Sequence, residues 1–290
     1  MNLDVAHRGV DEVGEGPIWD FRAQELLWID VTQGVVHRLN PITSAHTSLS
    51  IGVHIGAVAF YSDEFLIAAI RDGFATISKS NGSINYLSQV IHENTIRFND
   101  GKCDPLGRFI AGTMRYLPEP GSAALYSYNK AGEVREILNG VGLSNGLCWD
   151  ASGTRFYYID TLTKEISLFE YNTENGALSK RKTFYTFATN DGSPDGMTID
   201  VNGNLWVALW GGGKVRCINT HAQVIAEIKL PVSQPTSVAF GGEKLDQLFI
   251  TSARFQLSSE QQSKEPLAGS LFVADVGVQG VNEPTFGIGR

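Results

Sequence analysis

The chain has 290 residues, of which 42% are hydrophobic and 19% are charged, and its formal net charge is −8 at pH 7. A net negative charge without clusters of Lys and Arg argues against a nucleic-acid or anionic-membrane partner and favours a cation or a neutral polar ligand. The N-terminal residues resemble no signal peptide, and no apolar run approaches the roughly 18 residues of a membrane span. We therefore expect a cytoplasmic protein.

The cysteines and histidines give no sign of a metal site or a disulfide framework. The three cysteines, Cys103, Cys148 and Cys217, are odd in number and widely separated, which predicts small core residues. Six histidines occur without H-x-H or H-E-x-x-H spacing: His7, His37, His46, His54, His92 and His221. We expect them on the surface or in loops.

Six short apolar segments recur along the chain, each preceded by turn residues. They begin at Leu26, Phe65, Arg108, Arg155, Asn204 and Gln247. Because they are rich in β-branched and aromatic residues and too short for a stable helix, they are predicted strands. A second strand-like segment follows, beginning at Gly34, Phe74, Ala124, Glu165, Lys214 and Ser270, and predicts β-hairpins.

A third short segment lies ahead of each hairpin. These segments begin at Glu15, Gly56, Asp100, Asn145, Asp195 and Thr236, a spacing of about 41 to 50 residues that is typical of propeller blades. Six such periods nearly exhaust the chain, and no Pro/Ser-rich linker interrupts them. The pattern predicts an all-β fold, a six-bladed β-propeller with four-stranded antiparallel blades and a central metal site, as a single domain over residues 1–290.

Oxygen-bearing side chains occupy four of these six starting positions. They are Glu15, Asp100, Asn145 and Asp195, with Thr236 a weaker fifth. Innermost strands of a propeller line one channel, so three carboxylates would repel each other unless a divalent cation neutralised them. Oxygen ligands favour hard cations, although zinc and iron also accept carboxylates. The alternative is that acidic or amide residues before glycine are simply turn residues.

Longer motifs carry a resemblance to a known family. They are GEGPIWD from Gly14, RFNDGKCDPLGRFIAGTM from Arg97, LSNGLCWD from Leu143, SPDGMTIDVNGNLWVALWGGG from Ser193 and PTSVAFGG from Pro235. Over essentially the whole chain the sequence resembles the SMP-30/gluconolactonase/regucalcin family. The resemblance implies a six-bladed propeller with one divalent metal ion, in a family whose members are mainly sugar lactonases.

The resemblance also implies roles for individual residues. Glu15, Asn145 and Asp195 match the metal ligands, and Arg97 and Asn99 match substrate-binding positions. Glu119 matches a third substrate-binding position, in a loop that departs from the family's commoner pattern. As the catalytic base the family suggests Asp195, but a carboxylate bound to a cation is a poor base, which leaves the neighbouring channel carboxylate Asp100 as the alternative.

The resemblance implies the metal-dependent hydrolysis of a small sugar lactone, such as glucono-, xylono- or arabinonolactone, and we expect the protein to be a monomer. The one divalent metal ion could be Ca²⁺, Zn²⁺, Mn²⁺, Mg²⁺ or Fe²⁺, because oxygen ligands do not choose among them. Two alternatives are a Ca²⁺-binding regulatory protein of the regucalcin type without turnover and a WD40-type scaffold, whose W-D signature is missing.

Overall fold

The computed structural model describes residues 2–289, and over this range the chain is almost entirely β-structure. The described strands form six sheets, each with four antiparallel strands paired in order. The only helices in this range are a single six-residue α-helix, α1 (Ser259–Lys264), and two short 3₁₀ turns. The predicted fold class, an all-β propeller of six four-stranded antiparallel blades, is confirmed.

The chain divides into two compact units. Unit 1 contains the N-terminal residues up to Ser48 and the segment Phe187–Val281, and unit 2 contains Leu49–Thr186 and the C-terminal residues from Asn282. Each unit holds three blades. Unit 1 is therefore built from two distant stretches of sequence.

The blades of unit 1 run from the innermost to the outermost strand as follows. The first is β2 (Gly14–Asp20), β3 (Glu25–Asp30), β4 (Val35–Asn40) and β5 (Ala45–Ser50). The second is β18 (Ser193–Ile199), β19 (Leu205–Trp210), β20 (Lys214–Ile218) and β21 (Val224–Lys229). The third is β22 (Pro235–Gly241), β23 (Gln247–Ser252), β24 (Leu271–Asp275) and β1 (Asn2–His7).

The blades of unit 2 follow the chain without interruption. The first is β6 (Ile55–Phe60), β7 (Phe65–Ile70), β8 (Gly73–Ser78) and β9 (Ile84–Gln89). The second is β10 (Ile96–Cys103), β11 (Phe109–Arg115), β12 (Ala123–Tyr128) and β13 (Val134–Val141). The third is β14 (Ser144–Trp149), β15 (Arg155–Asp160), β16 (Glu165–Tyr171) and β17 (Leu178–Thr186).

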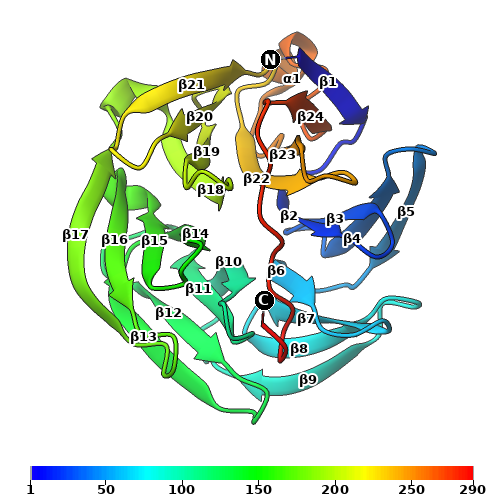
Figure 1. The fold of residues 1–290 in the computed structure, drawn as a ribbon. Coiled ribbons are helices and arrows are strands. Elements are labelled where there is room, and N and C mark those ends of the chain that lie inside the picture. The colour runs from blue at the N-terminus through cyan, green and yellow to red at the C-terminus, as the bar shows by residue number, and fades with distance from the viewer. Residues whose placement is uncertain (1, 290) are drawn as a thin grey trace. The chain divides into compact units, whose positions relative to one another are not determined.

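One blade of unit 1 contains strands from both ends of the sequence. Strand β1 pairs antiparallel with β24, with Leu3 opposite Ala274 and Val5 opposite Phe272, and Figure 1 shows the blue β1 beside it. The first strand of the chain is thus the fourth strand of the last blade. This pairing covers the edge of β24, which would otherwise present unpaired backbone groups.

Alternating side chains of the inner strands make the core of each unit. In unit 2, Phe74 packs against Phe98 and stacks on Tyr128, which in turn stacks on Phe286. The three cysteines are buried and unpaired, as predicted. Trp19, Trp149 and Trp206 are buried as well.

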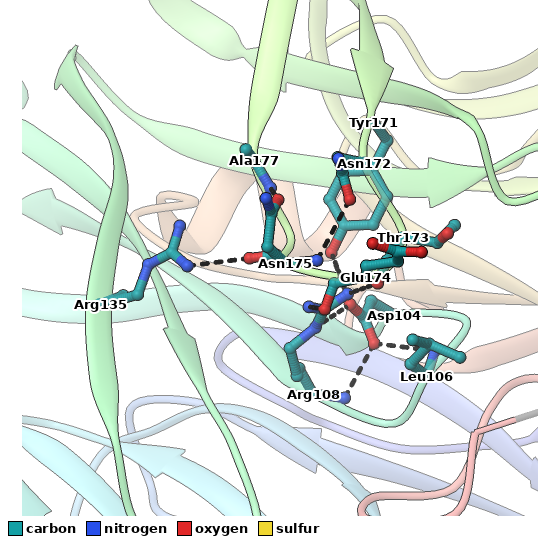
Figure 2. A network of polar contacts seen from close by, with 10 residues as sticks. All are labelled: Asp104, Leu106, Arg108, Arg135, Tyr171, Asn172, Thr173, Glu174, Asn175 and Ala177. Carbon is teal, nitrogen blue, oxygen red and sulfur yellow. Dashed lines mark hydrogen bonds and ion pairs between the residues drawn. The ribbon is translucent and has the colours of Figure 1, made fainter.

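A buried aspartate links two blades of unit 2 (Figure 2). Asp104, in the turn between β10 and β11, is fully buried and accepts hydrogen bonds from the backbone and the guanidinium of Arg108 and from the hydroxyl of Tyr171. Arg108 also donates to the carbonyls of Thr173 and Glu174 in the hairpin turn between β16 and β17. The carboxylate, the guanidinium and the phenol thus hold one turn against the other.

Candidate functional site

A β-bulge lies at the same place in all six innermost strands. The pairing of these strands with their neighbours shifts register at Glu15/Ile18, Ile55/Ala57, Phe98/Asp100, Asn145/Leu147, Pro194/Met197 and Pro235/Val238. Bulges redirect side chains and are over-represented next to active sites. They coincide with the positions that the sequence pattern singles out.

Unit 1 carries two of the predicted metal ligands, Glu15 on β2 and Asp195 on β18. Their exposed fractions are 8% and 7%. The Glu15 carboxylate accepts a hydrogen bond of 2.9 Å from the backbone N–H of Gly16, whose φ of +52° is a conformation that favours glycine. A Cβ at Gly196, the residue after Asp195, would overlap Ser237. Glycine is therefore required after each acid, by conformation at Gly16 and by close packing at Gly196.

An ion-pair network holds the segment that leads into Asp195. Arg216 donates to both carboxylate oxygens of Asp191, at 2.7 and 2.6 Å, and also binds Glu227. The hydrogen bonds from the buried Arg216 lower the pKa of Asp191 well below its usual range. The bidentate pair fixes Asp191 four residues ahead of Asp195.

Thr236, the weaker fifth candidate, has a structural contact. Its fully buried hydroxyl donates to the carbonyl of Gly14 and lies 2.7 Å from the hydroxyl of Thr251. The residue therefore fixes the start of β2, one position before Glu15.

Unit 2 carries a row of hydrogen-bonded polar side chains. The buried Arg97 donates from Nη1 to Oδ1 of Asn99 at 2.8 Å. Asn99 donates from Nδ2 to Oδ1 of Asn145 at 3.0 Å and to the carbonyl of Ser144 at 2.8 Å. Asn145 in turn donates to the hydroxyl of Thr161. Hydrogen bonds thus connect two predicted substrate-binding residues, Arg97 and Asn99, to the third predicted metal ligand, Asn145.

Asp100 follows this row on β10 and is buried. Burial raises its pKa to about 6, against the opposing effects of the Lys102 charge and the backbone hydrogen bond from Gly101. Lys102 itself forms an ion pair with Glu283 of the C-terminal segment. A carboxyl group that titrates near neutral pH is suited to general acid–base work.

The Glu119 side chain is exposed, in the loop between β11 and β12. The same loop begins with Tyr116, whose ring lies over the Arg97 guanidinium at 6.0 Å and whose hydroxyl lies 3.0 Å from Nδ1 of His54. No sequence pattern pointed to Tyr116 or His54, because their meeting depends on loop geometry. Trp210 is half-buried and has its ring 6.5 Å from that of Phe255.

Unit 1 also contains a hollow of about 510 Å³, apart from the predicted ligands. Its lining includes Gly211–Gly213, Lys214, Glu227 and Glu265. Neither Glu15 nor Asp195 is among the lining residues. Three of its charged groups have protein partners, since Lys214 contacts Glu227 and Glu265 accepts from Ser233.

The expectation that the histidines lie on the surface or in loops is wrong for three of them. His7, His37 and His46 lie on β1, β4 and β5 and meet in unit 1, with His7 and His46 stacked at 4.0 Å and His37 Nδ1 3.1 Å from His46 Nε2. The ring of Trp28 stacks on His37 at 4.8 Å. Asp11 accepts from Trp28 Nε1 and lies 3.3 Å from His37 Nε2, close enough for an ion pair but not aligned as a hydrogen bond.

The donor chemistry of the predicted ligands suits a hard cation. Two nearly buried carboxylates and one amide oxygen are groups that Ca²⁺, Mg²⁺ and Mn²⁺ prefer, and buried carboxylates are costly without compensation. Across residues 2–289, no set of three or more His, Cys, Asp and Glu side chains is arranged to hold a metal. The same part of the chain contains no helix with the length and apolarity that a membrane span requires.

Comparison with known proteins identifies relatives along the whole chain. The family model described as "SMP-30/Gluconolactonase/LRE-like region" matches residues 13–254. The Bacillus subtilis protein named "Putative sugar lactone lactonase YvrE" is 39% identical over 277 residues, which cover 94% of each chain. Regucalcin of Danio rerio is 38% identical, with 97% of each chain covered.

A solved structure shares the fold. The structure described as a calcium-binding protein, regucalcin, from Agrobacterium tumefaciens superimposes with a TM-score of 0.93 at 27% identity, covering 97% of this chain and 96% of that one. Because the family model spans most of the chain and two relatives exceed 30% identity over nearly their full length, this protein belongs to the SMP-30/gluconolactonase/LRE-like family.

Proposed function

We propose that this protein hydrolyses small sugar lactones, such as glucono-, xylono- or arabinonolactone, to the sugar acids with the help of one divalent metal ion. The observation that carries the proposal is the 39% identity, over 94% of both chains, to a relative named as a sugar lactone lactonase. The retained residues Arg97, Asn99 and Asp100 support it, because a ligand rich in hydroxyl groups needs directed donors and acceptors.

In this proposal Glu15, Asn145 and Asp195 supply the protein ligands of the cation. Asp195 lies within the β-bulge of its innermost strand, and Glu15 and Asn145 each lie at the edge of one. A divalent ion with open positions polarises an ester carbonyl and lowers the pKa of bound water. The ion itself would be Ca²⁺, Zn²⁺, Mn²⁺, Mg²⁺ or Fe²⁺, chosen by supply in the cell.

The other residues bind substrate and move protons. Arg97 and Asn99 would orient the ring hydroxyls and stabilise negative charge that develops on the carbonyl oxygen. Glu119, in its exposed loop, would contact the substrate from the rim. Asp195 is the first candidate for the base, and Asp100 is the second, supported by its pKa of about 6.

The proposal is tested by proton release from a panel of aldonolactones. Chelator-stripped protein is assayed alone and after each divalent ion is added back, beside Asp195→Ala and the control Asp246→Ala, which removes an exposed aspartate of the same unit. We expect turnover that requires metal, is lost in Asp195→Ala and is retained in Asp246→Ala.

The second candidate function is Ca²⁺ binding without turnover. It is favoured by the likeness to a structure described as a calcium-binding protein, regucalcin, at a TM-score of 0.93. The same panel separates the two functions: calcium binding measured by calorimetry, with no acid released from any lactone under any ion, would leave only this candidate.

A further inference from the structure

Arg97 is buried, and its Nη1 group is already directed to protein acceptors. It donates to the carbonyl of Phe98 and to Oδ1 of Asn99, each at 2.8 Å. Both bonds use Nη1 and so hold one end of the planar guanidinium, and packing on its faces restrains the group further. In this protein an aromatic ring lies over one face.

That ring belongs to Tyr116, which lies 6.0 Å from Arg97 Cζ. At this distance the ring attracts the cation, and the attraction is stronger for a guanidinium that is shielded from water. The side chain is 42% exposed, so it covers the arginine on one side and faces solvent on the other. Tyr116 therefore separates the buried Arg97 guanidinium from solvent on this side.

Tyr116 is itself held by two segments outside its own loop. Its hydroxyl lies 3.0 Å from Nδ1 of His54, just ahead of β6, and its backbone N–H donates to the carbonyl of Thr95, just ahead of β10. The neighbouring Arg115 also donates to the hydroxyl of Thr95 and pairs with Glu93. The end of β11 and the first residue of the loop are thus fixed, while Leu117 beyond them is exposed.

The contacts continue from Tyr116 into the proposed site. Arg97 binds Asn99, and Asn99 binds Asn145, the proposed metal ligand of this unit. We propose that Tyr116, braced by His54, is a positioning residue that fixes the Arg97 guanidinium for lactone binding. This inference rests on the proposed function for its substrate, but its structural part concerns the order of Arg97 alone.

The test uses three variants of exposed tyrosines. Tyr116→Leu removes the ring, Tyr116→Phe removes only the hydroxyl that meets His54, and Tyr86→Leu is the control, since Tyr86 is 54% exposed in the same unit and its hydroxyl also contacts a side chain, that of Asp72. The readouts are kcat and KM on the lactone with the highest turnover, thermal stability, and hydrogen exchange at the Arg97 Nε–H by NMR.

We expect Tyr116→Leu to lower kcat/KM about tenfold, mainly through KM, and to speed exchange at Arg97 Nε–H. Tyr116→Phe should lower kcat/KM about threefold. Tyr86→Leu should change neither kcat/KM nor the exchange rate at Arg97 Nε–H. A purely structural role would lower the unfolding temperature without this split between KM and kcat.

Two outcomes would overturn the inference: an unchanged KM in Tyr116→Leu, or Arg97 Nε–H exchange equal to that of the wild type. Should the wild type turn over no lactone, the proposed function fails. The exchange measurement then still decides whether Tyr116 positions Arg97.

Discussion

Asp100 is a buried carboxyl group, and its burial affects the stability of the fold. Its pKa is raised from 3.8 to about 6, mainly because burial disfavours the carboxylate. Between these two pH values the folded state binds more protons than the unfolded state. The contribution of this group to stability therefore falls as the pH rises through that window.

We expect Asp100→Asn to stabilise the metal-free protein at pH 8 by about 1–3 kcal/mol, because the amide resembles the neutral acid and can keep an acceptor for Gly101 N–H. The same substitution should lower lactonase activity at least tenfold if Asp100 is the base. Urea denaturation at pH 8 and pH 4 measures the first effect, and the gain should disappear at pH 4. Equal stability at pH 8 would contradict the assignment of a raised pKa.

At the scale of elements, single buried polar groups hold strands and turns together. In unit 2 the Asp104 carboxylate does this through its hydrogen bonds to Arg108 and Tyr171. Asp104→Ala would leave the Arg108 guanidinium without its carboxylate, and removal of one partner of a buried ion pair costs about 3–5 kcal/mol. Tyr171→Phe removes only the phenol donor and should cost about 1–2 kcal/mol.

The matched control is Arg135→Ala, which removes an exposed hydrogen bond to the carbonyl of Asn175 in the same hairpin turn. It should change the unfolding free energy by less than about 0.5 kcal/mol. Chemical denaturation measures all three variants. Because the turns at Asp104 and Asn175 do not include the proposed site residues, KM should stay the same, and a changed KM would argue that this link also shapes the site.

The histidine cluster makes the contact of β1 with β4 and β5 sensitive to acid. Burial, and then the neighbouring imidazoles of His7 and His37, lower the pKa of His46 to about 4, while the carboxylate of Asp11 opposes this. The pKa of His7 is lowered as well, first by burial. Between pH 6.5 and about 4, His46 of the unfolded chain is protonated while His46 of the folded cluster stays neutral. The free energy of unfolding should therefore fall as the pH drops through this range.

His46→Phe should flatten this part of the pH profile, because phenylalanine can stack on His7 and cannot be protonated. The control is His221→Phe, at an exposed histidine of the same unit, which should leave the slope unchanged. Urea midpoints between pH 4 and pH 7 measure the slope. Identical slopes in His46→Phe and the wild type would show that another group dominates acid unfolding.

At the scale of the whole molecule, the C-terminal segment completes a unit whose blades end about 100 residues earlier. Phe286 is buried between Tyr61 and Tyr128, and its N–H donates to the carbonyl of Phe60. Phe286→Ala should cost about 3–5 kcal/mol, whereas Ile288→Ala, at an exposed position, should cost little. Calorimetry measures both, and a single transition in the wild type would support the prediction that residues 1–290 form one domain.

The blade pattern was readable from the sequence because the inner three strands of each blade are apolar and recur at a fixed spacing. All 18 of the strands predicted from these segments overlap inner strands of the structure, as β3 (Glu25–Asp30) and β15 (Arg155–Asp160) illustrate. The outermost strands were not predicted, because they are exposed to solvent and mix polar with apolar residues. An example is β17 (Leu178–Thr186), whose middle residues are exposed.

Contacts between distant segments were equally hidden from the sequence. The pairing of β1 with β24, the meeting of three histidines and the approach of Tyr116 to Arg97 all depend on tertiary geometry and leave no local pattern. The roles assigned to Glu15, Asn145, Asp195 and Glu119 stay predictions. What the structure adds is the burial of Glu15, Asn145 and Asp195, the β-bulges in their strands, and the hydrogen bonds that link Asn145 to Asn99 and Arg97.

The pairing of β1 with β24 has a consequence for synthesis on the ribosome. Strand β1 emerges first, but the strand that will cover its edge is translated near the end of the chain, after a delay on the order of tens of seconds at ~5–20 residues per second. Throughout this time the segment that will form β1 has no partner strand, and its unpaired backbone groups can form hydrogen bonds with other chains. Slow translation or a crowded polysome should therefore favour aggregation or chaperone capture through the N-terminal residues.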